Sequence, residues 1–161
     1  MTAEQSAREA RWDIEDFHSD YAEVLERGDI EQWPSFFTED AFYQVIARDN
    51  AESGLPLGLI YCEGKGMLKD RAYALKHTEM YAPRYLRLYV CNTRITGMEG
   101  ALIRARASYL LLETNTDEPT RVHQAGVYRD VFERGAQGLL IKERRCIYDT
   151  VLVNNCLVFP V

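Results

Sequence analysis

The sequence of 161 residues has the length of one ordinary domain, and 47% of it is hydrophobic and 27% charged. This balance is typical of a globular protein that builds a core of its own. A formal net charge of −6 argues against nucleic acid or an anionic membrane surface as the partner. We therefore expect one domain over residues 1–161.

Targeting signals are not recognisable in the sequence. The N-terminal residues are charged throughout and lack the apolar run of a signal peptide. No stretch approaches the ~20 apolar residues that a membrane-spanning helix needs. The four cysteines form no CxxC pair, so we interpret them as reduced thiols of a cytoplasmic protein, with a disulfide as the less favoured alternative. They are Cys62, Cys91, Cys146 and Cys156.

The first expected element is a long helix over residues 3–27, because apolar residues recur there at three- and four-residue spacing. Gly28 is a natural stop, since glycine readily adopts the left-handed conformation that ends helices. Asp29 then caps a second helix over residues 30–37, in which Pro34 predicts a tight first turn. The expected buried side chains are Ile14, Phe17, Tyr21, Val24 and Leu25 in the first helix, and Ile30, Trp33, Phe36 and Phe37 in the second.

A hairpin and a third helix are expected next. After a stop at residues 38–40, residues 41–47 predict a strand, and residues 57–63 predict its antiparallel partner. The intervening residues 48–56 are rich in turn formers and predict a loop. Residues 64–78 predict a helix that Pro83 prevents from continuing. We expect its packed side to contain Met67, Leu68, Tyr73 and Leu75.

Strands complete the expected order. Alternating apolar and polar residues predict four of them, with a turn between Gly97 and Gly100. Strands that pair behind a cover of helices predict an α+β fold, in which N-terminal helices pack on a curved, mainly antiparallel sheet. This order resembles the cystatin-like, or NTF2-like, cone. The four strands are expected over residues 86–91, 103–111, 121–133 and 139–152, and one face of the second consists of Ile103, Ala105, Ala107, Tyr109 and Leu111.

The end of the sequence is unusually apolar. Residues 156–161 contain almost no polar side chain, whereas chain ends are usually polar and frayed. Two interpretations stand: the segment folds back onto the core of its own chain, or it lies in a subunit interface.

Candidate catalytic residues are few. The three histidines have no metal-ligand spacing, and the paired Cys and His motifs of a Rieske cluster are absent from the sequence. One set of side chains could converge in the pocket of a cone-shaped domain, where it would abstract a proton beside a carbonyl or eliminate water. In the alternative interpretation, Asp40 caps a turn, Tyr21 belongs to the core and His123 lies in a strand. The candidate set is Tyr21, Asp40, His77 and His123.

Arginines are frequent on the expected strands. They form either a solvated sheet face or part of a protein interface, where the guanidinium fork makes directed hydrogen bonds. These arginines are Arg84, Arg87, Arg94, Arg104, Arg106, Arg129, Arg144 and Arg145.

Three segments of the sequence carry a family resemblance. They are Glu31-Gln32-Trp33-Pro34-Ser35-Phe36-Phe37-Thr38-Glu39-Asp40 followed by a strand, the helix-opening Gly66-Met67-Leu68-Lys69-Asp70-Arg71, and Asp149-Thr150 with the apolar ending. Together they resemble the small (β) subunits of aromatic ring-hydroxylating dioxygenases over nearly the whole chain. Within that family the sequence looks most like the small subunits of oxygenases acting on aromatic carboxylates, such as salicylate 5-hydroxylase and terephthalate dioxygenase.

This resemblance implies a cystatin-like fold and a structural role. It implies an assembly of three large and three small subunits, in which the small subunits associate as a trimer. It also implies that the large subunit holds the Rieske [2Fe-2S] cluster and the mononuclear Fe(II), and that this chain has no cofactor, metal or catalytic residue. The alternative function is that of a freestanding isomerase or dehydratase of the same fold, which would use the acid–base set named above.

Overall fold

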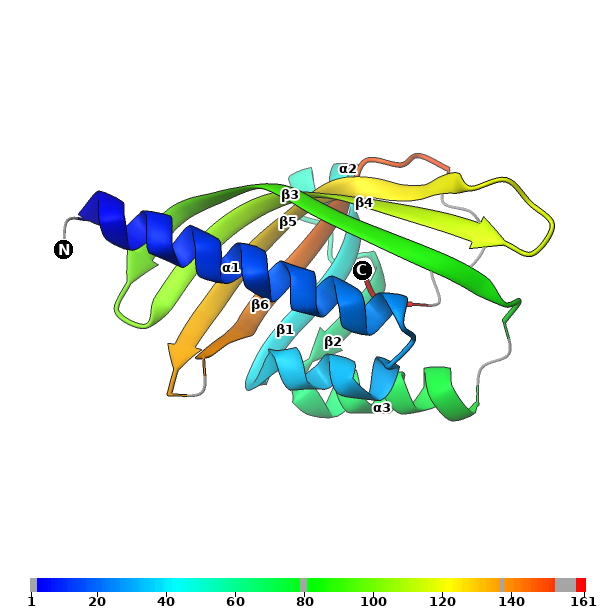
Figure 1. Cartoon of the computed structure of the whole chain (residues 1–161), viewed down its shortest axis with the longest axis horizontal. Helices are drawn as coiled ribbons and strands as arrows, with labels where there is room; N and C mark the ends of the chain where they lie inside the picture. The colour runs from blue at the N-terminus through cyan, green and yellow to red at the C-terminus, as the bar shows by residue number, and fades with distance from the viewer. Residues whose placement is uncertain (1–2, 79–80, 137, 153–158) are drawn as a thin grey trace.

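Six strands form one mixed sheet in the order β2-β1-β6-β5-β4-β3 (Figure 1). The computed structural model describes residues 3–78, 81–136, 138–152 and 159–161. The strands are β1 (Phe37–Ala47), β2 (Gly58–Glu63), β3 (Arg84–Glu99), β4 (Leu102–Asn115), β5 (Arg121–Gly135) and β6 (Gly138–Tyr148). Neighbouring strands are antiparallel except β1 and β6, which run parallel to each other.

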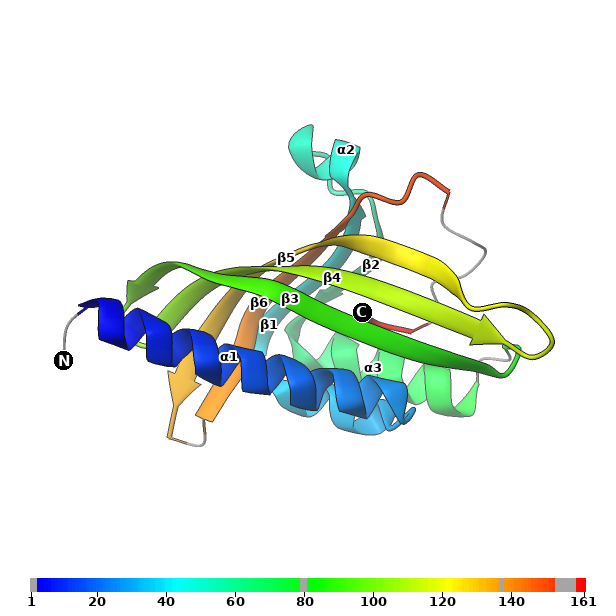
Figure 2. The same cartoon turned by 45° about the horizontal axis from the view of Figure 1, so that its top comes forward.

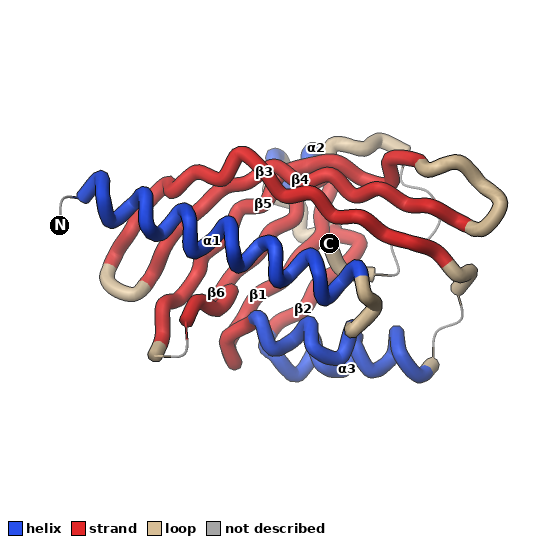
Figure 3. The backbone as a smooth tube through the Cα atoms, in the orientation of Figure 1, coloured by secondary structure: helices blue, strands red, loops and turns tan. Residues whose placement is uncertain are grey.

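The helices are α1 (Ala3–Glu26), the 3-10 helix η1 (Ile30–Phe36), the short α2 (Arg48–Glu52) and α3 (Gly64–His77). Helices α1, η1 and α3 cover one face of the sheet, as the tube view shows most directly (Figure 3). In Figure 1, α1 crosses strands β3 to β6, while η1 and α3 lie beside β1 and β2. Figure 2 shows α2 projecting from the far end of β1, away from the other helices. The predicted α+β fold with helices on a curved, mainly antiparallel sheet is confirmed.

Helix α1 buries the face that its apolar spacing predicts. Ile14, Tyr21, Val24 and Leu25 are buried and Phe17 is half-buried against the same core. The inward side chains of β4 alternate as expected, because residues two apart on a strand point to the same face. Ile103, Ala105, Ala107, Tyr109 and Leu111 are all buried.

The junction between helix and sheet differs from the prediction. The second helix is a 3-10 helix that ends at Phe36, and Phe37 begins β1. Pro34 lies inside this helix and cannot donate a backbone hydrogen bond, which disfavours a regular α-helix. The predicted stop at residues 38–40 is wrong, because those residues belong to β1.

The loop and helix predictions around β2 need two corrections. Residues 48–52 form α2 instead of a loop, whereas the antiparallel pairing of β1 with β2 is confirmed. In α3, Met67 and Tyr73 are exposed, so their predicted packing is wrong. The buried face consists of Leu68, Ala72 and Leu75, which lie at four- and three-residue spacing on one side of the helix.

The observed strand boundaries also differ from the predicted ones at the other end of the sheet. β3 runs on to Glu99 and includes Gly97, so the turn lies at Gly100, whose φ of 59° suits glycine. Within β3 the register shifts between Cys91 and Arg94, and Asn92 has a φ of 57°. Such a bulge bends the strand and increases its local twist. β6 ends at Tyr148 and not at residue 152.

Candidate functional site

Tyr21 lies in the centre of the core. Its hydroxyl accepts a hydrogen bond from Trp33 Nε1 at 2.9 Å and donates one to the main-chain oxygen of Val161 at 3.0 Å. Burial raises the pKa of Tyr21, so the phenol stays protonated at neutral pH. The interpretation of Tyr21 as a core residue is therefore confirmed.

Residues 159–161 return to this core and lie between the helices and the sheet. Val161 is fully buried, and its main-chain oxygen also accepts a hydrogen bond from the Tyr43 hydroxyl at 3.0 Å. The Val161 N–H donates to the same hydroxyl at 2.9 Å. The prediction that the segment folds back is confirmed for residues 159–161, whereas Cys156 and residues 157–158 lie outside the described residues.

Asp40 lies on β1 and faces solvent. Lys142 Nζ lies 2.6 Å from its carboxylate, and the Thr38 hydroxyl donates to it at 2.9 Å. The hydrogen bond from Lys142, followed by that from Thr38, lowers the pKa of Asp40. The interpretation of Asp40 as a turn cap is wrong, because Asp40 lies within a strand.

His77 is the last residue of α3 and is also exposed. Its Nε2 lies 3.1 Å from Glu31 Oε1, and its ring lies against that of Tyr73 with 4.4 Å between centroids. This is a surface contact between α3 and η1 and involves none of the other candidate residues.

His123 is buried near the start of β5, within a group of charged side chains. Its Nε2 lies 3.7 Å from Glu113 Oε2, and Glu113 accepts hydrogen bonds from Arg84 at 3.1 Å and Arg121 at 2.7 Å. Burial lowers the pKa of His123, so its imidazole is neutral at pH 7. Burial also opposes the charge on Glu113, but Arg121 and Arg84 outweigh it and lower the pKa of that carboxyl.

The four candidate residues do not form one site. Lys142 contacts both Asp40 and Glu133, at 2.6 and 3.4 Å, which places Asp40 beside the end of β5. His123 lies near the start of the same strand, ten residues earlier. At about 3.3 Å per residue this separation is roughly 30 Å along the strand. Asp40 and His123 therefore cannot act on one substrate together.

A buried cluster of His18, Asp130 and Arg144 was missed in the sequence interpretation. Arg144 donates from Nε to Asp130 Oδ1 at 2.9 Å and from Nη2 to Oδ2 at 2.8 Å. Its guanidinium lies 4.5 Å from the ring centroid of Tyr21 and 4.1 Å from that of Tyr128. His18 Nε2 lies 3.5 Å from Asp130 Oδ2, too long for a good hydrogen bond.

Charge within this cluster is balanced. Burial opposes ionisation of Asp130, but Arg144 and the polar contact with His18 lower its pKa, while Asp130 raises that of Arg144. Burial lowers the pKa of His18, so the imidazole is neutral. The exposed fractions are 3% for His18, 3% for Asp130 and 0% for Arg144. A substrate cannot reach these groups in the folded chain, so we interpret the cluster as part of the core.

The stability of the protein is expected to fall when the pH drops from 7 to 5. The folded-state pKa of His18 and His123 is lowered by burial, whereas both imidazoles take up protons near pH 6.5 in the unfolded chain. Their contribution is complete above pH 6.5 and is lost as the pH falls toward the folded-state values. The slope is at most about 1.4 kcal/mol per pH unit for each histidine.

This dependence is measurable by urea unfolding at several pH values. His18→Gln should flatten the slope between pH 5 and 7, because it removes one of the two buried imidazoles. Equal slopes in the His18 variant and the parent would contradict the expectation.

No group of three or more His, Cys, Asp or Glu side chains is placed to hold a metal ion within residues 3–78, 81–136, 138–152 and 159–161. Over those ranges, no helix is both long enough and apolar enough to cross a membrane.

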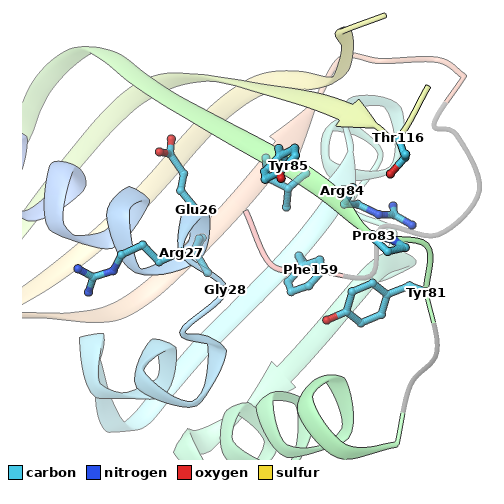
Figure 4. Close-up of a pocket in the computed structure, with 11 residues that line it drawn as sticks. Glu26, Arg27, Gly28, Tyr81, Pro83, Arg84, Tyr85, Thr116 and Phe159 are labelled. Atoms are coloured by element: carbon cyan, nitrogen blue, oxygen red, sulfur yellow. The ribbon is translucent and has the colours of Figure 1, made fainter. Parts of the chain in front are cut away.

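A pocket of about 360 Å³ opens between the end of α1 and the start of β3 (Figure 4). Phe159 and Tyr81 meet edge to face on one side of it, with 4.9 Å between ring centroids. Its charged side chains are engaged: Arg84 binds Glu113, and Glu26 accepts hydrogen bonds from Arg87 and from a β3 backbone N–H. Among the described residues that line it, none is a histidine or cysteine, so they offer apolar surface without an evident nucleophile.

The strand arginines divide into two groups, apart from Arg87, which is exposed on β3 and pairs with Glu26 of α1. Arg144 belongs to the core, and Arg84 is largely buried against Glu113, so neither a solvated face nor an interface describes them. The second group is exposed on the face that α1, η1 and α3 leave open. Its members are Arg94, Arg104, Arg106, Arg129 and Arg145.

Comparison with known proteins identifies the relatives of this chain. Residues 6–145 match the SnoaL-like domain family. The small subunit of anthranilate 1,2-dioxygenase from Burkholderia cepacia is 33% identical over 88% of each chain. A terephthalate 1,2-dioxygenase terminal oxygenase beta subunit from a Comamonas species is 28% identical over 89% of this chain and 94% of its own.

A solved structure extends this similarity to the fold. It is provisionally assigned as the beta subunit of an aromatic-ring-hydroxylating dioxygenase from Novosphingobium aromaticivorans. It superposes with a TM-score of 0.89 at 39% identity, over 97% of this chain and 99% of the other. The predicted resemblance to the small subunits and the predicted NTF2-like fold are both confirmed.

Proposed function

Because the chain belongs to the SnoaL-like domain family, and within it to the small subunits of aromatic ring-hydroxylating dioxygenases, we propose that it supports assembly of such an oxygenase. The observation that carries this proposal is similarity to small subunits along nearly the whole chain. The holoenzyme is an oxidoreductase of aromatic-acid catabolism, in which this chain has a structural role. A core filled by Val161 and by the Asp130–Arg144 pair supports that role.

The large and small subunits have different roles in this assembly. The partner is a large subunit that carries the Rieske [2Fe-2S] cluster and the mononuclear Fe(II), and this chain holds no cofactor. Three copies of each subunit form the assembly, and the small subunits contact one another as a trimer. The assembly is cytoplasmic, and the free thiols of Cys62, Cys91 and Cys146 support this location.

Co-expression with a large Rieske subunit tests this function. The large subunit should be the one encoded by the Rieske oxygenase reading frame that lies closest to the gene for this chain. The two chains are expected to purify as one stable heteromer with oxygenase activity toward an aromatic acid. A chain that stays alone and turns over a carbonyl substrate would instead establish the alternative function of an isomerase or dehydratase.

Replacing His123 by Ala separates the two functions. Oxygenase turnover is expected to stay within about 2-fold of the parent, because a structural subunit contributes no proton transfer. In the alternative function of an isomerase or dehydratase with His123 as the general acid or base, turnover of the carbonyl substrate would fall by about 100-fold or more. His77→Ala is the matched control at an exposed position, and unfolding curves of both variants show whether they remain folded.

A further inference from the structure

A row of arginines crosses the sheet on the face opposite α1 and α3. Arg94 of β3 lies directly opposite Arg106 of β4, Arg106 opposite Arg129 of β5, and Arg129 opposite Arg145 of β6. Residues directly opposite on neighbouring strands project their side chains to the same face. All four are exposed, and the residues beside them on each strand include the buried Ala105, Ala107, Tyr128, Asp130, Arg144 and Cys146. We call these four residues the arginine row.

This row carries positive charge that the chain itself neutralises poorly. Like charges at directly opposite positions destabilise a sheet. Arg145 Nε lies 2.6 Å from Glu143, and its guanidinium lies over the ring of Phe42. No described residue forms an ion pair with Arg94, Arg106 or Arg129. The row therefore favours a partner that brings carboxylates to it.

Apolar side chains border the row on the same face. The half-buried Val127 and the buried Ile147 lie opposite each other on β5 and β6, two positions from Arg129 and Arg145. Val131 is half-buried on the other side of Arg129. Arginine among apolar residues is the composition that protein interfaces favour. The chemistry of this face thus fits a protein surface that combines carboxylates with apolar groups.

A groove of that composition lies on the helix side of this same chain. It has a volume of about 450 Å³, and Asp13, Asp16 and Asp20 of α1 form one wall. Asp13 is paired with Arg134 at 2.6 Å, whereas no ion pair with another described residue is recorded for Asp16 or Asp20. The lining also contains the half-buried apolar side chains of Phe17, Phe36, Leu139 and Leu140, together with Ser35, Arg134 and Gly138. We call this the acidic groove.

We propose that the arginine row of one copy binds the acidic groove of a second copy. The row and the groove lie on opposite sides of the sheet, so one copy cannot join them within itself. Two different patches that meet head to tail form a heterologous contact, which closes into a ring when the rotation permits. This inference rests on the proposed role as an assembling subunit and specifies which surfaces join the small subunits.

Charge reversal on each surface tests the contact in the full-length chain, by sedimentation at 50 and 500 mM salt. The wild-type chain is expected to associate, and more strongly at low salt. Arg106→Glu/Arg129→Glu and, separately, Asp16→Lys/Asp20→Lys should each weaken self-association by at least about 10-fold. An equimolar mixture of the two variants should associate again, because each intact patch then meets an intact counterpart.

Lys69→Glu/Lys76→Glu is the matched control for the arginine variant, since it lowers the net charge by the same amount on the exposed side of α3 and should associate like the wild type. A wild-type chain that stays monomeric would overturn the inference, as would variants that associate unchanged. A mixture that fails to associate would exclude the acidic groove as the counterpart. Loss of the large subunit from the Arg106→Glu/Arg129→Glu variant, with self-association retained, would assign the row to that partner. Co-purification of the wild-type chain with a large subunit tests the proposed function separately.

Discussion

Replacing Asp130 by Asn is expected to lower the free energy of unfolding by about 3–5 kcal/mol. The substitution keeps the size of the side chain but removes the charge that balances Arg144. Arg144 is fully buried and makes two hydrogen bonds to Asp130, at 2.9 and 2.8 Å. Tyr21 and Tyr128 flank the guanidinium, but their rings cannot replace a carboxylate. An uncompensated charge would then remain in the core.

A double variant distinguishes the loss of charge balance from the loss of packing. Asp130→Leu combined with Arg144→Met removes both charges and keeps similar volumes, and replacing a buried ion pair in this way is often neutral or stabilising. We expect this variant to be more stable than Asp130→Asn in urea unfolding. If Asp130→Asn lowers the free energy of unfolding by less than about 1 kcal/mol, the pair is not the charged core element described above.

Replacing Trp33 by Ala is expected to lower the free energy of unfolding by about 3–5 kcal/mol as well. Trp33 is fully buried, and its ring meets those of Phe37 and Tyr43 edge to face at 5.4 and 5.1 Å between centroids. Its Nε1 donates to the Tyr21 hydroxyl. The substitution therefore creates a cavity at the junction of η1 with β1 and removes a buried hydrogen bond.

The other tryptophan provides the control for this experiment. Trp12 lies on α1 with 47% of its surface exposed, and the Arg8 guanidinium lies 4.8 Å from its ring centroid. Trp12→Ala should cost no more than about 1 kcal/mol, the size of an exposed cation–π contact. Thermal or urea unfolding of both variants measures the difference. Similar losses at the two positions would mean that Trp33 does not anchor the core.

Periodicity in the sequence was sufficient to predict most elements of the fold. The spacing from Ile14 to Leu25 identified the buried face of α1, and the alternation from Ile103 to Leu111 identified that of β4. These patterns are local, and each reports burial on one side of one element. The prediction was wrong for Met67 and Tyr73. Only the side of α3 that carries Leu68, Ala72 and Leu75 is buried, and Met67 and Tyr73 lie outside it.

The polar core could not be predicted in the same way. Asp130 and Arg144 occupy inward positions of β5 and β6, which the alternation with Tyr128 and Cys146 suggests. Their pairing, however, depends on the register that places position 130 directly opposite position 144. Register results from tertiary packing, so the sequence alone left Arg144 among the surface arginines. For the same reason it could not show that Asp40 and His123 lie far apart.

The parallel pairing of β1 with β6 has a consequence for how the chain is made. β1 pairs with residues 141–148 of β6, about 100 positions later. At about 5–20 residues per second, its partner leaves the ribosome roughly 5–20 s after it. Strands β3 to β6 pair with their neighbours in sequence, so they can form hairpins as they emerge. Until β6 is complete, β1 and its neighbour β2 are not joined to the rest of the sheet, so chaperones are expected to bind the aromatic side chains of η1 and β1 in the nascent chain.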